Sequence, residues 1–268
     1  VSCAGSAHGS PLAASRDGAA SRRSSTLSTD NHSRSSSQSA RSRRNSRRRS
    51  SLLYDGSAWP AFTGGDAALA RVRAALPTFG FSALDYSPDD LLIVAGQIFL
   101  EMELDKLLRV FWPSVQSFVI SVRARMIDNP YHNWTHVVDV TQTVYSLAVQ
   151  SGVLAGLTGT QRLALFLAAL CHDLEHPGVT AAYLLKSQSA LAACYRRDPA
   201  LLERHHSLRA FELMSCHDIG LLQSLTAEER VEVSSLVRDV IMATDMSRHA
   251  AFCAATAAAT AAATAAAT

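Results

Sequence analysis

The sequence predicts an all-α fold, and three observations support this prediction. Apolar residues recur at three- and four-residue intervals after about Leu53, which is the period of an amphipathic helix. No segment alternates convincingly between apolar and polar residues with the period of two expected of a half-buried strand. Thr226 and Glu229 have the spacing of a capping box, which is a signal for the start of a helix.

The expected helices follow one another along the chain, separated by short breaks. Gly64-Gly65 and the segment 87–90, with the sequence SPDD, punctuate the first segments of helical periodicity. The apolar segment 91–111 follows the second break. Further helices are expected at 114–127, 133–150, 160–171, 205–215 and 227–246.

Hydropathy and cysteine usage exclude two classes of protein. The longest apolar runs, such as residues 163–171, reach about half of the ~20 residues that a membrane-spanning helix needs. The five cysteines are scattered, odd in number and without CxxC spacing, which argues against a disulfide framework. No charged-then-apolar signal peptide opens the sequence. We therefore expect a cytoplasmic protein without a transmembrane segment.

The first 52 residues differ in composition from the rest. Residues 1–52 hold ten arginines, two aspartates and almost no large apolar side chains, whereas the remainder holds 15 Lys and Arg against 21 Asp and Glu. A Ser/Arg-rich segment of this kind buries too little apolar surface to offset the entropy lost on ordering. We expect a disordered basic tail, followed by an acidic folded region.

Arg-Arg-x-Ser sequences in the basic tail end at Ser25, Ser46 and Ser51. They resemble the sites of basophilic protein kinases, and a phosphate there would cancel local positive charge. The alternative is a tail that is merely solvated. Contact with nucleic acid is conceivable from charge alone but is the weakest of these hypotheses, because the remainder of the chain is acidic.

The histidines are the most informative residues. Six of the ten fall in three close pairs: His132/His136, His172/His176 and His205/His206. The i,i+4 spacing of the first two pairs places both rings on one helical face. Histidine nitrogen beside the carboxylate of Asp173 suits a zinc-type ion, and oxygen-rich neighbours suit Mg²⁺ or Mn²⁺. The alternative to a metal site is a buried polar network.

Four motifs in fixed order sharpen this prediction. They are 130-PYHNWTHVVDVTQTVY-145, 170-LCHDLEHPGVTAAYL-184, 202-LERHH-206 and 243-ATDMSRH-249. A His-Asp dyad within helices is typical of metal-dependent phosphohydrolases of the HD type. Together the motifs resemble the catalytic domain of class I cyclic nucleotide phosphodiesterases, over roughly residues 76–252.

The resemblance implies a function and a set of cofactors. The expected reaction is hydrolysis of cAMP, cGMP or both to 5′-monophosphates in signal transduction. It uses two divalent ions, Zn²⁺ at the tighter site and Mg²⁺ or Mn²⁺ at the second. His132 would be the general acid that protonates the ribose 3′ oxygen. His136, His172 and Asp173 would bind the tighter ion, with Asp173 also reaching the second.

The same resemblance implies roles for residues around this centre. Those expected to hold the waters of the second ion by hydrogen bonds are His176, Glu203 and Thr244. Those expected at the substrate pocket are Tyr131, Asp245 and Met246.

The sequence departs from the family in two places. The signature that begins at His172 has Asn or Gln nine residues later in the family, where this chain has Ala181. After Asp245 there is no Asp, Glu, Gln or Asn, so the family's fourth ligand of the tighter ion and its purine-binding glutamine have no counterpart. We expect the N-terminal portion of the domain at 53–252 and an Ala/Thr low-complexity tail at 253–268. The alternative function is a truncated, inactive metal-binding or regulatory fragment.

Overall fold

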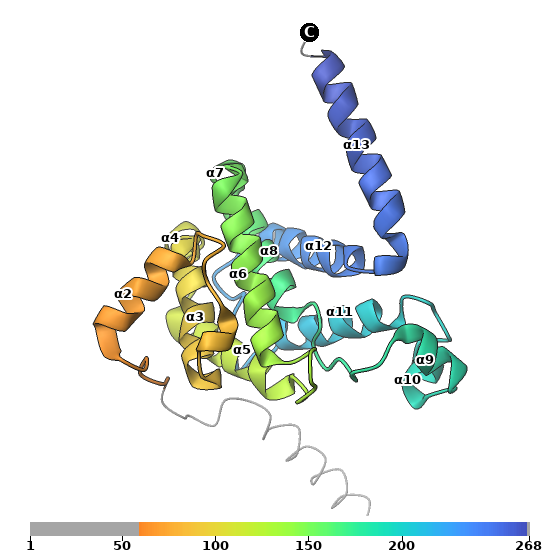
Figure 1. Cartoon of the computed structure of the whole chain (residues 1–268), viewed down its shortest axis with the longest axis horizontal. Coiled ribbons are helices and arrows are strands. Elements are labelled where there is room, and N and C mark those ends of the chain that lie inside the picture. Colours follow the sequence, from red (N-terminus) through yellow and green to blue (C-terminus); the bar gives the residue numbers. More distant parts are fainter. Residues whose placement is uncertain (1–58, 267–268) are drawn as a thin grey trace, which may run out of the picture. The chain divides into compact units, whose positions relative to one another are not determined.

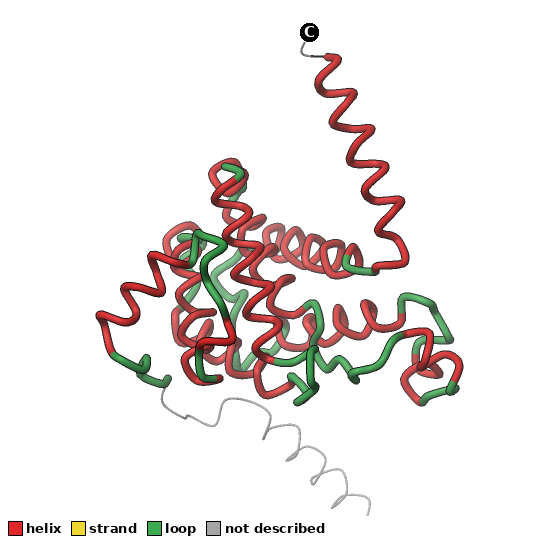
Figure 2. The backbone as a smooth tube through the Cα atoms, in the orientation of Figure 1, coloured by secondary structure: helices red, strands yellow, loops and turns green. Residues whose placement is uncertain are grey.

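The computed structural model describes residues 59–266, and every regular element among them is a helix (Figure 1 and Figure 2). The all-α prediction is therefore confirmed for this part of the chain. The basic tail, with Ser25, Ser46 and Ser51, lies outside the described residues. The elements are α2 (Gly65–Ala75), η1 (Ala83–Asp85), α3 (Pro88–Glu101), α4 (Leu104–Leu107), α5 (Trp112–Arg125), α6 (Trp134–Gln150), α7 (Val153–Gly156), α8 (Gly159–Cys171), α9 (Ala181–Lys186), α10 (Ala190–Cys194), α11 (Leu201–Met214), α12 (Ala227–Ala243), η2 (Met246–Arg248) and α13 (His249–Ala266).

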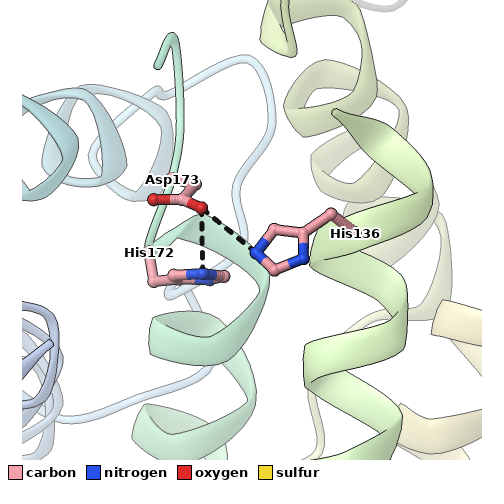
Figure 3. Close-up of side chains that lie close together, drawn as sticks. All are labelled: His136, His172 and Asp173. Carbon is pink, nitrogen blue, oxygen red and sulfur yellow. Dashed lines mark ion pairs between the residues drawn. The ribbon is translucent and has the colours of Figure 1, made fainter. Parts of the chain in front are cut away.

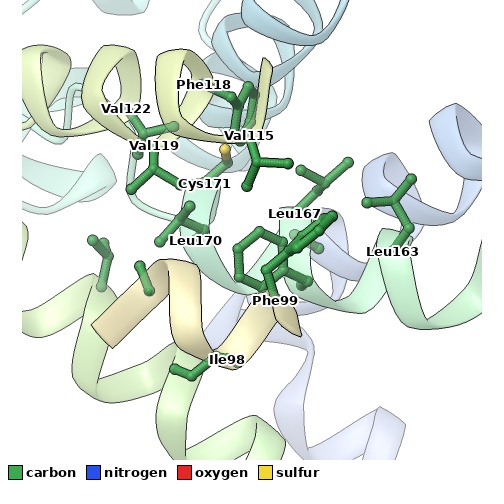
Figure 4. Close-up of a cluster of buried hydrophobic side chains, with 14 of the residues drawn as sticks. Ile98, Phe99, Val115, Phe118, Val119, Val122, Leu163, Leu167, Leu170 and Cys171 are labelled. Carbon is green, nitrogen blue, oxygen red and sulfur yellow. The ribbon is translucent and has the colours of Figure 1, made fainter. Parts of the chain in front are cut away.

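Helix α8 is the core helix that positions the site. It packs against α4, α6, α11 and α12. Its side chains Leu163, Leu167, Leu170 and Cys171 are fully buried, and Figure 4 shows them among side chains of α3 and α5. A helix that is apolar on nearly all sides is stable only when it is surrounded by other elements. This burial holds the C-terminal end of α8 in place, directly before His172.

The segment expected as one helix at 91–111 is two helices. α3 starts earlier, at Pro88, because the Ser87 hydroxyl accepts a hydrogen bond from the backbone N–H of Asp90 at 3.1 Å. It ends at Glu101, and Glu103 then adopts a left-handed conformation with φ 58° that redirects the chain into α4. Leu104 is fully buried beyond the break, so the apolar spacing continues although the helix does not.

The other expected helices are confirmed with shifted ends. The largest shifts are at α11, which starts at Leu201 instead of 205, and at α12, which ends at Ala243 instead of 246. α12 ends there because the Asp245 carboxylate accepts from Ser247 N at 2.9 Å and starts η2. The predicted capping box of α12 is present, with both reciprocal hydrogen bonds between Thr226 and Glu229.

Three short helices, α7, α9 and α10, were not expected. They are four to six residues long, too short to show a helical period in the sequence. Local capping forms two of them, since Thr180 and Ser189 accept hydrogen bonds from the backbone at the start of α9 and α10. α9 starts at Ala181, directly after the loop that follows the His-Asp dyad.

The Ala/Thr segment forms helix α13, as the helix propensity of alanine favours. Its threonine hydroxyls at 256, 260 and 264 donate to the carbonyl oxygens four residues earlier, which satisfies them within the helix. Residues 251–265 are exposed. The expected boundary between 252 and 253 falls inside this helix.

Candidate functional site

All ten residues singled out from the sequence line one cavity of about 760 Å³. The remaining wall is largely apolar and comes from α6, α8 and α12, with Val140, Leu165 and Val240 among its side chains. A mostly apolar cavity with a few convergent polar groups is the usual form of a small-molecule site. The polar groups gather at one cluster of histidines and carboxylates.

The centre of the cluster is the carboxylate of Asp173 (Figure 3). Its Oδ2 atom lies 3.3 Å from Nε2 of His136, on the first turn of α6, and 3.2 Å from Nε2 of His172, at the end of α8. The ligand atoms of these three residues lie within 4.8 Å of one another. The two helices therefore present a compact set of one oxygen and two nitrogen ligands.

Local hydrogen bonds fix the start of the helix that carries His136 and orient the ring of His172. Asn133 caps α6, and its side-chain oxygen accepts from His136 N at 3.1 Å, which fixes the start of that helix. Nδ1 of His172 lies 2.8 Å from the carbonyl oxygen of Ala169. A carbonyl can only accept, so Nδ1 of His172 carries a proton, and Nε2, which faces Asp173, is the nitrogen left to bind an ion when the ring is neutral. This is the usual arrangement of a metal-ligating histidine.

The cluster holds Asp173 in its charged form. Burial alone would raise the pKa of Asp173, but hydrogen bonds from His136 and His172 and the charge of His172 hold this pKa well below its usual range. Burial would likewise lower the pKa of His172, but the hydrogen bond and charge of Asp173 raise it. A carboxylate that is ionised without any added cation is suited to bind one.

His206, on α11, also faces Asp173, although the sequence motifs assigned it no role in the site. Its Nε2 lies 3.8 Å from Oδ1 of Asp173, and its Nδ1 lies 2.8 Å from the carbonyl oxygen of Leu174. By the argument used for His172, the Nε2 lone pair of His206 faces the carboxylate. Burial lowers the pKa of His206 to about 4, so the ring is neutral at pH 7. The His205/His206 pair was the available signal, but adjacent residues face different directions on a helix, and only the packing shows which ring faces the site.

His132 and His176 form the second half of the cluster. Their rings stack with centroids 3.8 Å apart and an interplanar angle of 16°. The backbone N–H of Gly178 donates to Nδ1 of His176 at 3.0 Å, so the proton of the neutral ring is on Nε2. Burial lowers the pKa of His176 to about 4 and also lowers the pKa of His132. His176 therefore presents an N–H donor, whereas the neutral ring of His206 presents a lone pair.

Asn129 joins the loops that carry these two rings. Its amide nitrogen donates to the carbonyl oxygen of His132 at 3.1 Å and to that of His176 at 2.7 Å. Gly178 packs against this amide, and a Cβ atom there would lie 2.6 Å from the Asn129 side-chain oxygen. Ala181 has no amide, and Asn129, which was not singled out from the sequence, holds the loop after the dyad from another segment of the chain.

The other predicted residues line the same cavity, with Asp245 buried and Tyr131 and Met246 exposed. The ring of Tyr131 lies 4.6 Å from that of His136, centroid to centroid, and is largely exposed, as is Met246. Burial and the nearby charge of Asp245 raise the pKa of Glu203. The Thr244 hydroxyl donates to the carbonyl oxygen of Ile241 at 2.7 Å, which leaves its lone pairs free to accept.

Comparison with known proteins connects this site with a family. A family model described as 3'5'-cyclic nucleotide phosphodiesterase matches residues 131–266, about half of the chain. The chain belongs to this phosphodiesterase family. The matched residues include both histidine loops, the dyad, α11 and α12. The resemblance of the four sequence motifs is thereby confirmed.

Individual phosphodiesterases show the same likeness. The chain is 32% identical over 170 residues to the 3',5'-cyclic-nucleotide phosphodiesterase regA of Dictyostelium discoideum, covering 63% of this chain and 21% of that protein. It is 40% identical over 121 residues to the human dual specificity calcium/calmodulin-dependent 3',5'-cyclic nucleotide phosphodiesterase 1B, covering 45% of this chain and 22% of that protein. The phosphodiesterase domain of the RhoPDE fusion protein from Salpingoeca rosetta superposes with a TM-score of 0.64 at 32% identity, over 69% of this chain and 57% of that domain.

The chain thus spans about a fifth of the length of these two phosphodiesterases and little more than half of the solved domain. Among residues 59–266, no helix has the length and apolar character needed to cross a membrane.

Proposed function

We propose that this chain carries out the metal-dependent hydrolysis of 3',5'-cyclic nucleotides to 5'-monophosphates in signal transduction. The observation that supports this most directly is the position of Asp173. One of its oxygens faces His136 and His172, and the other faces His206, at the polar end of a largely apolar cavity. Membership of the phosphodiesterase family supplies the reaction class.

The donor atoms fit two divalent ions. His136, His172 and Asp173 offer the nitrogen and oxygen atoms that Zn²⁺ binds in open sites with three protein ligands. Asp173 has a second oxygen, in surroundings that suit Mg²⁺ or Mn²⁺ held largely through water. When bound, such a pair would neutralise phosphoryl charge and lower the pKa of a water from 15.7 towards about 7.

The surrounding residues would orient and protonate the substrate. His132 lies beside the cluster and acts as the general acid for the departing ribose 3′ oxygen. His176 donates through Nε2–H, while Glu203 and Thr244 accept, so the three hold waters in fixed orientations. Tyr131, Asp245 and Met246 line the cavity where the nucleotide binds.

The substrate is cAMP, cGMP or both. The human relative is named as a dual specificity enzyme, which is consistent with a site that accepts either base. The apolar wall of α6, α8 and α12 suits a purine ring, because its valine, leucine and alanine side chains offer no hydrogen-bonding groups to distinguish adenine from guanine.

A second candidate function is metal binding without turnover, as in a regulatory fragment. The observation that favours it is that the tighter cluster contains three protein ligands and that residues 246–268 contain no carboxylate or amide side chain to add a fourth. Three ligands can hold zinc while leaving the chemistry incomplete.

The remaining proposals concern the cell. We place the protein in the cytoplasm, with Ser25, Ser46 and Ser51 as substrates of a basophilic protein kinase. Incubation of the chain with such a kinase and labelled ATP, followed by peptide mapping, tests the three serines. Label confined to other residues would exclude them.

One assay distinguishes the two candidate functions. The purified 268-residue chain is loaded with Zn²⁺ and Mg²⁺ and incubated with cAMP or cGMP, and the 5'-monophosphate is measured by chromatography. Asp173→Asn provides the background. Product above this background supports the hydrolase. Stoichiometric zinc with no product above background would contradict it and support the binding fragment.

A further inference from the structure

Glu175 occupies an unusual position in the turn after α8. It lies between Asp173 and His176, and its backbone is left-handed, with φ 59°. Glycine adopts this conformation readily, whereas a residue with a Cβ atom does so at a steric cost. A strained conformation persists only when surrounding contacts determine it. The contacts of Glu175 should therefore explain why the strain is tolerated beside the proposed metal ligands.

The Glu175 carboxylate contacts three basic side chains from two helices. Arg125, the last residue of α5, places its Nη1 atom 3.6 Å from Oε1. On α11, Nε2 of His205 lies 3.1 Å from Oε2, and Nε of Arg209 lies 3.0 Å from the same oxygen. Burial alone would raise the pKa of Glu175, but the hydrogen bond with His205 and the charges of Arg209 and Arg125 hold it below its usual range. The carboxylate is therefore ionised at neutral pH.

A second layer fixes these basic groups. Glu212 lies 2.8 Å from Nη1 of Arg209 and 3.3 Å from Nη1 of Arg125, so it connects α11 with α5. The Tyr195 hydroxyl lies 3.1 Å from Nδ1 of His205. Glu212 thus shares both arginines with Glu175 but is located on a helix, away from the turn. Glu175 therefore connects the turn with α5 and α11, whereas Glu212 connects only the two helices with each other.

We propose that Glu175 is a positioning residue, which fastens the turn bearing Asp173 and His176 to α5 and α11. For its effect on metal binding, the inference rests on the proposed function. The path of action is short. Leu174 N donates to the carbonyl oxygen of Cys171 at 3.1 Å and His176 N to that of Asp173 at 3.0 Å, so the turn is a single hydrogen-bonded unit. Its left-handed residue sets the direction in which the chain leaves this unit.

Helix α11 takes part in both the candidate site and the charge cluster. α11 contributes His206 to the site, and it contributes His205 and Arg209 to the clamp, which is the set of basic side chains that contact Glu175. Glu175 therefore holds the turn against α11, the helix whose His206 ring faces Asp173. If the Glu175 side chain loses these contacts, the turn can move and Asp173 no longer keeps its position between His172 and His206.

The experiment compares Glu175→Gln with Glu212→Gln in the full 268-residue chain. Both variants remove one carboxylate charge from the same cluster and keep the side-chain size, but only the first acts on the turn. Hydrogen exchange of the metal-free chain is measured for a peptide that covers residues 172–178. We expect exchange in this peptide to become several-fold faster in Glu175→Gln and to stay at the wild-type rate in Glu212→Gln.

The second readout is the affinity for Zn²⁺ alone, measured by competition with a chromophoric chelator. We expect a loss of about 10-fold in Glu175→Gln and less than about 2-fold in Glu212→Gln, on the scale of groups that orient metal ligands. Far-UV circular dichroism checks that helical content is unchanged. Glu175→Ala, which keeps the strained Cβ and loses the clamp, should lose at least as much affinity.

Two results would overturn the inference. One is wild-type exchange in the Glu175→Gln turn. The other is an equal effect of both glutamine variants, which would mean that the cluster stabilises the fold as a whole. If Glu175→Ala does not fold, the isosteric glutamine variant decides. If the wild-type chain binds no zinc, the proposed metal-dependent function fails, and the exchange comparison still tests the positioning role.

Discussion

Asp173 and His206 face each other across 3.8 Å, from Oδ1 to Nε2, on the side of the carboxylate that His136 and His172 do not use. This relationship gives Asp173 one set of histidine neighbours on each oxygen. In the proposed two-metal hydrolysis, Asp173 would offer one oxygen toward each histidine set and would help to hold both ions. Under the proposed function, Asp173 is accordingly the residue on which metal binding would depend most.

Replacing Asp173 with Asn should reduce the affinity for Zn²⁺ by at least about 100-fold, because the amide keeps the shape but lacks the charge that binds the ion. The measurement is a chelator-competition titration with the purified chain. Asp139→Asn is the matched control, since Asp139 is exposed on α6, the helix that carries His136. Equal zinc affinity in Asp173→Asn and the wild type would favour a buried polar network without metal.

His132→Ala should lower cyclic nucleotide hydrolysis by roughly 100-fold or more, which is the lower end of the usual range for a general acid. Zinc affinity should remain near that of the wild type, because His132 is outside the two side-chain groups among residues 59–266 that could hold an ion, which are His136/His172/Asp173 and Asp173/His176/His206. Initial rates with cAMP and cGMP provide the measurement. His217→Ala, which alters an exposed histidine, is the control. Unchanged turnover in His132→Ala would remove the residue from this role.

Asn129→Ala should destabilise the chain by about 1–3 kcal/mol, because two carbonyl oxygens lose their donor. It should also lower hydrolysis, since the loops of His132 and His176 are no longer joined. Urea unfolding and initial rates are the two measurements. Asp128→Ala, at the exposed neighbouring residue, should have little effect. A stability equal to that of the wild type would show that the amide bridge contributes nothing.

The metal-free chain should respond to acid through His206. Its pKa is about 4 in the folded chain against 6.5 in the unfolded chain. Between these pH values the unfolded chain binds a proton at His206 that the folded chain does not bind. The free energy of unfolding is therefore highest above pH 6.5 and declines as the pH falls towards 4.

Between pH 7.5 and pH 5.0, the wild type should lose on the order of 1–2 kcal/mol relative to His206→Gln, whose side chain does not titrate. Urea unfolding in the presence of a chelator at the two pH values supplies the free energies. A difference between the two proteins that does not change with pH would mean that His206 titrates equally in both states.

Several features were predictable from the sequence because their causes are local. The i,i+4 spacing of His132/His136 and His172/His176 indicated where the site lies, but the expectation that each pair shares one helical face was wrong, because His132 precedes α6 and His176 follows α8. The capping box of α12 involves residues three apart. The break at Glu103 was missed, because apolar periodicity continues through a residue whose left-handed conformation has no marker in its side chain.

The sequence by itself determined the all-α class, the family and ten residues that line one cavity, because each of these depends on short-range patterns and ordered motifs. Only the tertiary structure decided that His206 faces Asp173, that Asn129 joins two histidine loops and that Glu175 is clamped by α5 and α11. These contacts join residues far apart in the chain. They depend on how α5, α6, α8 and α11 pack, and a helical period defines which face of a helix is buried without defining which helix will cover it.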